Sequence, residues 1–178
     1  MQRSIPLNMI TCSLCQTDEE EIIKRLVRQT EKIFDDTLRE RARELKMSVH
    51  EILTLASIIE GEAILDDERA TISGVYHNRL QKGMRLQADP TIQFIITDGP
   101  RRVLFDDLQI KSSYNTYLYS GLPPGPISNP RVASIHAALY PAQHDYLFFV
   151  SNGRGGHWFA SNYAGHMINV RRFRKERE

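Results

Sequence analysis

Cysteine is almost absent from the 178-residue chain, which has only Cys12 and Cys15, in a single C-x-x-C pair. Such a pair cannot form the disulfide framework of a small secreted protein. It also supplies too few ligands for a structural zinc site, and no second cysteine pair follows. We interpret it as an incidental pair in an N-terminal arm, with half of a zinc site or a redox pair as the alternatives.

Long hydrophobic runs are also missing. No window of about 18 apolar residues, the length that a membrane-spanning helix needs, occurs in the sequence. Residues 1–16 lack the apolar centre of a signal peptide. We therefore expect no membrane span, and a chain that either stays in the cytosol or lacks the segment that directs it elsewhere.

An excess of one charge is the third absence. The chain has 23 Lys and Arg residues against 22 Asp and Glu residues, a formal net charge of +1. Proteins that bind nucleic acids or anionic membranes usually carry a strong positive charge, so we expect neither partner. The basic cluster RRFRKERE at 171–178 is typical of a helix end, where Lys and Arg lie close to the last carbonyl groups.

The residues that are present predict an α+β fold. Apolar periodicity and end signals predict helices at 17–47, 48–65, 66–80, 130–142 and 162–176. A β-rich segment at 91–96 follows a break at Pro90, and two apolar runs around a Gly-rich turn predict a hairpin at 146–162. We expect several helices packed on a small antiparallel sheet in one domain, 17–178, after an irregular arm at 1–16.

Specific residues mark the helix ends. Thr17 or Asp18 can cap the first helix, and Ser48 with Glu51 forms a capping box at the start of the second. Gly83 follows the third helix as a stop signal. These signals predict where three of the helices begin or end.

A long irregular stretch at 105–130 contains four prolines and two glycines. Loops of this length are uncommon in compact domains and are often functional. Within it, GLPPGPISNP at 121–130 is expected to form a rigid loop and one wall of a groove.

Two glutamates stand in one of the most apolar runs of the chain, LTLASIIEGEAIL at 53–65. At about 100° per residue, Glu60 and Glu62 lie about 160° apart around the helix axis, on opposite flanks of the core face. They are therefore not expected to form the pair of carboxyl groups, roughly 5–9.5 Å apart, that ordinary glycosidases use. One of them can act as a single acid/base while the other supports the site.

Glu60 is the predicted acid. Its helical neighbours offer no cation, and an apolar wall raises the pKa of a carboxyl group towards neutrality. The alternative is an ordinary glutamate that forms a salt bridge. Glu62 is predicted to support the site by accepting loop N–H groups or by pairing with Arg69 or Arg85, so its replacement is expected to lower stability as well as activity.

Two further segments present polar side chains at every second position, as an extended chain does. These side chains are Arg85, Gln87 and Asp89 in the first segment, and Ser113, Asn115 and Tyr117 in the second. Amides, hydroxyls and an aromatic ring on one face suit a carbohydrate ligand. The alternative is that Asn115 and its neighbours only hold the long loop together.

His157 follows the Gly-rich turn GRGG and precedes the only tryptophan. A Gly-rich loop can bind phosphate where a strand enters a helix, but this one is predicted to lie in a hairpin. The histidines show no ligand spacing with cysteines or carboxylates, so we expect neither a metal nor another cofactor.

Five segments occur in a fixed order, namely LTLASIIEGEA, GVYHNRLQKGMRLQADPT, SSYNTYLYSGLPPGPISNP, YLFFVSNGRGGHWFASN and AGHMINV. Together they resemble the catalytic part of the YceG-like, or MltG, family of endolytic murein transglycosylases. The resemblance runs from about Thr17 to Arg174. Each segment alone is a weak signal, whereas the ordered set is specific.

The resemblance implies a lytic transglycosylase that cleaves peptidoglycan glycan strands between N-acetylmuramic acid and N-acetylglucosamine and leaves 1,6-anhydro ends. The family's catalytic glutamate falls on Glu60, and the sugar's own C6 hydroxyl replaces water, so one carboxyl group suffices. The expected substrate contacts are Gln87, Asp89, Asn115, Tyr117 and His157, and the expected supporting residues are Glu62 and Arg85.

Family members carry an N-terminal membrane helix and a LysM-like module, and they face the periplasm from the inner membrane. Neither is recognisable in this sequence, so we expect a soluble catalytic part with residues 1–16 as a remnant of the module. The implied partners are glycan strands and cell-wall synthesis enzymes. The alternatives are a glycan-binding module that truncation has made inactive, and a two-carboxylate hydrolase in which Asp89 faces Glu60.

Overall fold

The computed structural model describes residues 18–99 and 101–176, so the predicted arm at 1–16 and both cysteines lie outside the described residues. The chain divides into two compact units, with the boundary between Thr37 and Leu38. This boundary falls inside the domain that the sequence predicts.

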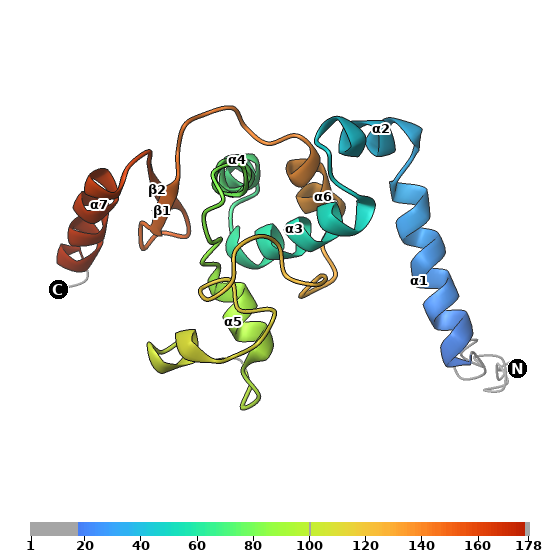
Figure 1. Cartoon of the computed structure of the whole chain (residues 1–178), viewed down its shortest axis with the longest axis horizontal. Coiled ribbons are helices and arrows are strands. Elements are labelled where there is room, and N and C mark those ends of the chain that lie inside the picture. The colour runs from blue at the N-terminus through green and yellow to red at the C-terminus, as the bar shows by residue number, and fades with distance from the viewer. Residues whose placement is uncertain (1–17, 100, 177–178) are drawn as a thin grey trace, which may run out of the picture. The chain divides into compact units, whose positions relative to one another are not determined.

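The first unit contains helix α1, Glu19–Ile33, which begins where the sequence predicts (Figure 1). The carboxylate of Asp18 accepts hydrogen bonds from the N–H groups of Glu20 and Glu21, so Asp18 is the cap. Four apolar side chains of this helix are exposed, namely Ile22, Ile23, Leu26 and Val27.

The single helix predicted for 17–47 is in fact two helices. α1 ends at Ile33, and α2 spans Asp36–Glu44. Between them Phe34 leaves the helical region, with φ −87° and ψ 75°. Aspartate competes with backbone hydrogen bonds inside a helix and is favoured near a helix start, so the Asp35–Asp36 pair favours a new helix over a continued one. The spacing of apolar residues continues across this break, so the periodicity alone predicted one helix.

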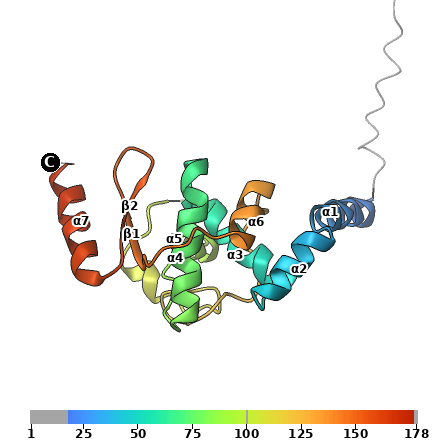
Figure 2. The same cartoon turned by 90° about the horizontal axis from the view of Figure 1, so that it is seen from above.

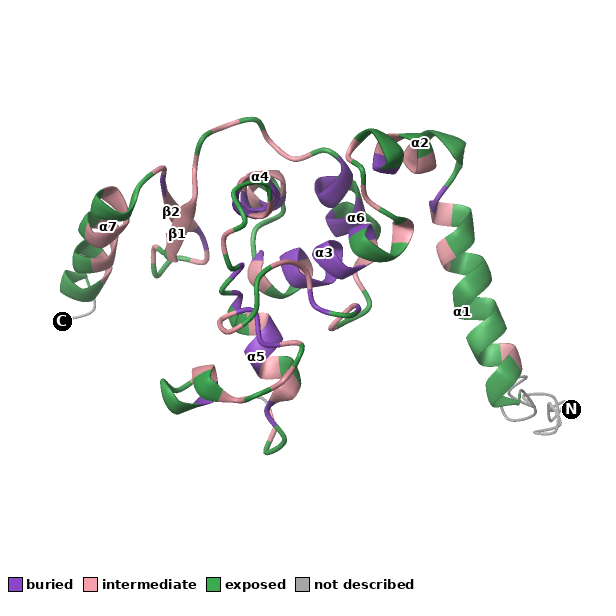
Figure 3. Cartoon of the chain, viewed as in Figure 1, coloured by how far each residue is buried: buried purple, intermediate pink, exposed green. Residues whose placement is uncertain are grey.

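The second unit is built around α3, Val49–Glu62, and the predicted capping box of Ser48 and Glu51 is confirmed. α3 packs against α4, Arg69–Gln81, and against α6, Val132–Leu139 (Figure 1, Figure 2). Many buried residues lie on these helices (Figure 3), and the apolar ones include Ile52, Leu55, Ile58, Ile59, Ile72, Val75, Ile135 and Leu139.

The segment predicted as a strand at 91–96 is helical, because α5 spans Asp89–Ile95. The prediction is wrong because Pro90 does not break the chain: proline is well tolerated in the first helical turn, where its missing N–H needs no partner. Gly61 allows α5 to approach α3 closely, since a Cβ atom there would lie 2.6 Å from Cβ of Pro90.

The predicted hairpin is confirmed, and with it the α+β class. β1, Phe148–Ser151, pairs antiparallel with β2, His157–Ala160, and the turn between them contains Gly153 and Gly155 with φ of 75° and 88°. α7, Tyr163–Lys175, packs on both strands. Figure 2 shows the hairpin beside α4, at one side of the second unit.

The stretch predicted to be irregular at 105–130 contains one 3-10 turn, η3, Asp106–Gln109, and no other helix or strand. It returns the chain from α5 to the start of α6. Within the described residues, no helix combines the length and the apolar character needed to cross a membrane.

Candidate active site

Glu62, the last residue of α3, lines a cavity of about 420 Å³. Its Oε1 atom accepts a hydrogen bond from the hydroxyl of Tyr76 in α4 at 3.0 Å. The other walls come from α5, through Asp89, Gln93 and Phe94, and from the long loop, through Ile127 and Ser128. Residues from four separate parts of the second unit therefore meet around one carboxyl group.

Burial raises the pKa of Glu62 to about 7. The negative charge of Asp89 acts in the same direction, whereas the hydrogen bond from Tyr76 and the charge of Arg79 oppose it. A carboxyl group with this pKa holds a proton on about half of the molecules at neutral pH. It can donate that proton to a leaving oxygen, which is what a general acid must do.

Asp89 is the second carboxyl group on this cavity. Its Oδ1 atom accepts a hydrogen bond from the hydroxyl of Tyr117 at 2.5 Å. Burial, followed by the interaction with Asp89, raises the pKa of the Tyr117 phenol well above its ordinary value, so the phenol stays protonated and keeps donating. Each carboxyl group thus has its own tyrosine, Tyr76 for Glu62 and Tyr117 for Asp89.

Glu60 lies on the other flank of α3, inside a cluster of hydrogen bonds and ion pairs. Nε of Arg131 donates to its Oε1 at 2.8 Å, Oγ of Ser134 donates to its Oε2 at 2.7 Å, and NH1 of Arg69 lies 3.4 Å from Oε2. Burial alone would raise the pKa of Glu60, but the hydrogen bonds from Ser134 and Arg131 and the charge of Arg69 bring it below the ordinary value. Glu60 is therefore ionised at neutral pH.

The helical neighbours of Glu60 offer no cation, as predicted, but two arginines from other elements reach its carboxylate. Arg69 is the first residue of α4, and Arg131 is the residue that precedes α6. Neither therefore appears on a helical wheel of α3. The predicted placement of the two glutamates on opposite flanks agrees with the structure, because Glu60 contacts the start of α6 whereas Glu62 faces α5.

The sequence predicts that Glu62 accepts loop N–H groups or pairs with Arg69 or Arg85. The pairing with an arginine does not form, whereas a hydrogen bond from the backbone of Asp89 lowers the pKa of Glu62. Arg69 pairs with Glu60 instead, and Arg85 donates to the carbonyl of Tyr117 at 3.1 Å. Arg85 therefore supports the long loop, while the side chain that donates to Glu62 is a buried tyrosine.

The alternating polar face predicted for 85–89 does not form. Gln87 has φ of 48°, so the chain turns there, and Asp89 is already the first residue of α5. Of the two substrate contacts predicted in this segment, Asp89 lines the cavity and Gln87 does not.

Asn115 is fully buried, and its amide is used inside the long loop. Nδ2 donates to the carbonyls of Leu108 at 3.1 Å and Ile110 at 2.8 Å, and Oδ1 accepts from the N–H of Tyr117 at 2.9 Å. This geometry favours the alternative interpretation, in which Asn115 holds the loop together. Through Tyr117, it also sets the hydrogen bond to Asp89.

His157 anchors the hairpin to the short 3-10 helix η2, Asp66–Glu68. Its N–H and Nδ1 contact the carboxylate of Glu68 at 2.9 Å and 2.8 Å, and a Cβ atom at Gly156 would lie 2.7 Å from the same carboxylate. His157 does not line the cavity. In the part of the chain that the structure describes, no cluster of His, Cys, Asp and Glu is arranged to hold a metal ion.

Gln93 and Phe94 belong to the cavity but were missed by the sequence analysis. Phe94 is 48% exposed, and its ring centroid lies 4.8 Å from that of Tyr114. Nε2 of Gln93 donates to the carbonyl of Arg101, while its Oε1 is buried without a hydrogen-bond partner in the described structure. Their shared surface with Asp89, four positions before Gln93, would have been visible had the segment been recognised as a helix.

The chain belongs to the YceG-like family, whose model matches residues 14–172. It is similar to the endolytic murein transglycosylase of Bacillus subtilis (strain 168), with 44% identity over 139 residues, which cover 78% of this chain and 38% of that protein. It is also similar to the endolytic murein transglycosylase of Streptococcus pneumoniae serotype 2 (strain D39 / NCTC 7466), with 34% identity over 130 residues, 70% of this chain and 24% of that protein. The predicted family is thus confirmed.

A solved structure supports the fold. The crystal structure of a yceG-like protein from Listeria monocytogenes superposes with a TM-score of 0.78 at 41% identity. The match covers 85% of this chain and 49% of that one. The chain therefore spans less than half the length of each relative described here.

Proposed function

We propose that this chain is the catalytic part of an endolytic peptidoglycan transglycosylase, and that Glu62 is its acid/base. The observation that carries the proposal is the raised pKa of Glu62 in an open cavity. The similarity to proteins named endolytic murein transglycosylase supports the substrate class. Glu60 suits the role less well, because two arginines hold its carboxylate in the ionised form.

In the proposed reaction, protonated Glu62 gives its proton to the oxygen that links N-acetylmuramic acid to N-acetylglucosamine, as the bond to the anomeric carbon breaks. The resulting carboxylate takes the proton of the muramic acid C6 hydroxyl, whose oxygen attacks the same anomeric carbon. This new bond closes the 1,6-anhydro ring, and Glu62 is protonated again. One carboxyl group acts first as acid and then as base, so no water is consumed.

Asp89 supports a second candidate, a hydrolase with two carboxyl groups. It lines the same cavity as Glu62, and its charge contributes to the raised pKa of Glu62. In our proposal Asp89 instead helps to keep Glu62 protonated, and Tyr117 holds Asp89 in place. The two mechanisms differ in their products, because a hydrolase leaves reducing ends and a lytic enzyme leaves anhydro ends.

We propose Phe94 as the surface on which a sugar ring stacks. It is exposed on the cavity, and Tyr114 supports its ring. Every unit of the glycan strand has a sugar ring, so stacking on Phe94 suits binding at any internal position of the strand.

We propose glycan strands as the substrate of the whole protein and cell-wall synthesis enzymes as its protein partners, on the strength of the family. The same resemblance supports a place at the periplasmic face of the inner membrane for the family. These proposals concern proteins of the full length of the relatives, of which this chain spans less than half.

The experiment that tests the proposed function is a digest of purified peptidoglycan with this chain, analysed by mass. We expect fragments with 1,6-anhydro ends. Fragments with reducing ends would support the two-carboxylate hydrolase instead. Binding to the glycan without any product would support the inactive glycan-binding module.

A further inference from the structure

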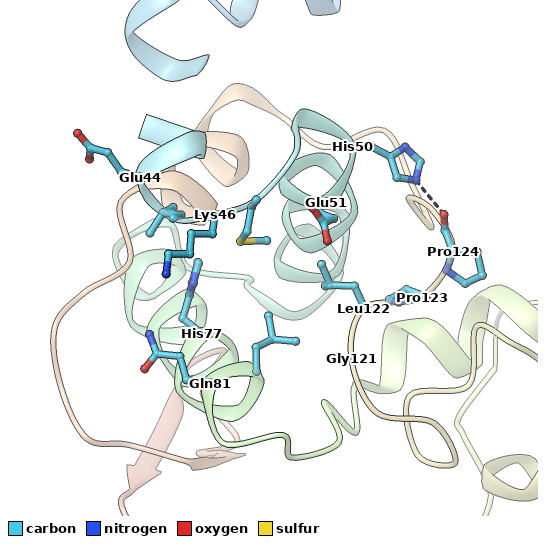
Figure 4. Close-up of a pocket in the computed structure, with 13 residues that line it drawn as sticks. Glu44, Lys46, His50, Glu51, His77, Gln81, Gly121, Leu122, Pro123 and Pro124 are labelled. Atoms are coloured by element: carbon cyan, nitrogen blue, oxygen red, sulfur yellow. Dashed lines mark hydrogen bonds between the residues drawn. The ribbon is translucent and has the colours of Figure 1, made fainter. Parts of the chain in front are cut away.

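A second cavity, of about 800 Å³, lies at the end of α3 opposite to Glu62 (Figure 4). Its walls are the turn after α2, the first turn of α3, the last turn of α4 and the start of the 121–130 loop. Lys46, His77 and Gln81 lie on one side of the cavity, and Leu122 and Pro123 lie on the other, together with Glu51 (Figure 4). A few convergent polar groups in a largely apolar pocket are typical of ligand sites.

Lys46 occupies a backbone position that usually belongs to glycine. Its φ is 56°, in the left-handed region. Its N–H donates to the carbonyl of Arg43 at 2.8 Å, and the N–H of Met47 donates to the carbonyl of Ala42 at 3.0 Å, the two bonds that close a helix end. A side chain is strained in this conformation, and such strain is concentrated at functional sites. The turn itself does not require a lysine, so its conformation does not account for a lysine side chain at this position.

The charge of Lys46 is not neutralised inside the cavity. Of the two carboxylates that line it, Glu44 pairs with Arg41 at 2.6 Å, and Glu51 accepts from the N–H and the hydroxyl of Ser48 at 2.8 Å. In the described part of the chain Lys46 forms no ion pair. Lys46 therefore offers an ammonium group without an ion-pair partner to a carboxylate ligand, while Glu51 is held by Ser48 and keeps its own negative charge on the cavity wall.

His77 adds an acceptor to this charge. Its Nε2 contacts the carbonyl of Ala138 at 2.8 Å, and because a carbonyl only accepts, Nε2 carries the hydrogen. Burial lowers the pKa of His77, so the ring is neutral at neutral pH and Nδ1 is an acceptor. A cation beside a neutral acceptor suits a ligand with both a carboxylate and an N–H group, which a peptide offers.

The long loop joins the two cavities along α3. Near the start of α3, Nε2 of His50 donates to the carbonyl of Pro124 at 2.8 Å. Further along, the N–H of Ile127 donates to Oγ of Ser57 at 2.9 Å, where Ile127 already lines the cavity of Glu62. The two sites therefore share one helix and one loop.

The separation of the two cavities matches the reach of a short peptide. Glu51 lines the second cavity and Glu62 the first, and the 11 positions between 51 and 62 correspond to about 16 Å of helix. An extended peptide of about five residues spans about 17 Å. A peptide attached to a sugar beside Glu62 can therefore reach Lys46.

We propose that the second cavity binds the peptide stem that peptidoglycan carries on N-acetylmuramic acid, with a stem carboxylate at Lys46 and a stem N–H at His77. This inference rests on the proposed function, because it takes the same substrate. A stem held in the second cavity would position its sugar, and with it one glycosidic bond, next to Glu62. The stems would then determine where along the strand the enzyme cuts.

The test measures binding with the Glu62→Gln protein, so that affinity is separated from cleavage. The probes are glycan strands with their peptide stems and the same strands after an amidase has removed the stems. We expect tighter binding of the stem-bearing strands, and we expect Lys46→Gly to weaken only that binding, by about 10-fold. The melting temperature of Lys46→Gly should be equal or higher, because glycine suits the φ of 56°.

Lys82→Ala is the matched control, because it removes an exposed positive charge that does not line the cavity. It should leave the affinity for both probes unchanged. Equal affinity for both probes, an equal loss on both, or the same loss in Lys82→Ala would overturn the stem site. A failure of the unsubstituted chain to cleave peptidoglycan would overturn the proposed function instead, since this comparison of affinities does not depend on cleavage.

Discussion

The hydroxyl of Tyr76 and the carboxyl group of Glu62 lie 3.0 Å apart, although the two residues belong to different helices and stand 14 positions apart in the chain. Tyr76 is fully buried, and its ring packs edge-on against Phe149 of β1 with 5.9 Å between centroids. The core of the second unit therefore fixes the tyrosine, and the tyrosine orients the carboxyl group that we propose as the acid.

Replacing Tyr76 by Phe removes this hydrogen bond and keeps the ring packing. The hydrogen bond lowers the pKa of Glu62 against the larger effect of burial, so its loss raises that pKa further. The alkaline limb of the pH–rate profile should move to higher pH, with a loss of rate at neutral pH of no more than about 10-fold. Profiles of both proteins measured side by side check this, and an unmoved alkaline limb would show that Tyr76 does not act on Glu62.

Stability should depend on pH through Glu62. Its pKa is about 7 in the folded protein against an ordinary value of 4.5, so the folded state holds the proton more tightly than the unfolded chain. The associated stability is fully present below the ordinary pKa and is lost as the pH rises through the folded pKa, by up to about 3 kcal/mol.

Glu62→Gln cannot ionise, so it should melt at a higher temperature than the unsubstituted chain at about pH 8 and at a similar temperature at about pH 5. This reverses the sequence-based expectation that the substitution destabilises the protein. Thermal unfolding of both proteins at both pH values measures the effect. A constant difference in melting temperature between them would contradict the raised pKa.

Glu60→Gln should destabilise the protein. It removes the negative charge beside Arg69, whose side chain is 2% exposed and whose other carboxylate, Asp66, is 75% exposed. We expect a loss of about 1–3 kcal/mol in the free energy of unfolding, because a buried charge loses its partner. Cleavage per folded molecule should stay within about 10-fold of the original, as measured by thermal unfolding beside a cleavage assay.

Phe94→Ala should weaken substrate binding more than catalysis. Loss of a stacked sugar ring costs about 0.5–1.5 kcal/mol, which appears as a higher KM with little change in kcat. Phe94→Trp should retain the stacking surface. Phe105→Ala serves as the control, because Phe105 is 88% exposed and does not line the cavity. If Phe105→Ala raises KM as much as Phe94→Ala does, then Phe94 has no specific role.

Local signals predicted the fold where local interactions decide it. The capping box of Ser48 and Glu51 and the glycines of the hairpin turn each form within a few residues, so the sequence shows them directly. The prediction of a strand at 91–96 is wrong because β-branched residues have only a weak preference for strands. The packing of buried Thr91 and Ile92 beside α3 overrides this preference.

The candidate site depends even more on contacts between residues that are far apart in the sequence. The helical wheel placed Glu60 and Glu62 on opposite flanks, but it contains no information on what each flank meets. Arg131 reaches Glu60 from 71 positions away, and Tyr76 reaches Glu62 from 14 positions away. Arg131 helps to lower the pKa of Glu60, whereas burial raises the pKa of Glu62 against the hydrogen bond from Tyr76, and a helical wheel shows neither effect. The sequence therefore identified both glutamates, and the structure favours Glu62 as the proposed acid.

The role of Glu62 as the acid/base is tested by comparing Glu62→Gln with Glu60→Gln in the digestion of purified peptidoglycan, with the products identified by mass. A general acid–base group typically contributes about 10²–10⁴-fold, so Glu62→Gln should lose at least about 100-fold in rate while remaining folded. Glu60→Gln should still release 1,6-anhydro fragments. The proposed role of Glu62 is contradicted if Glu62→Gln retains more than about a tenth of the original rate, or if folded Glu60→Gln is the variant that releases nothing.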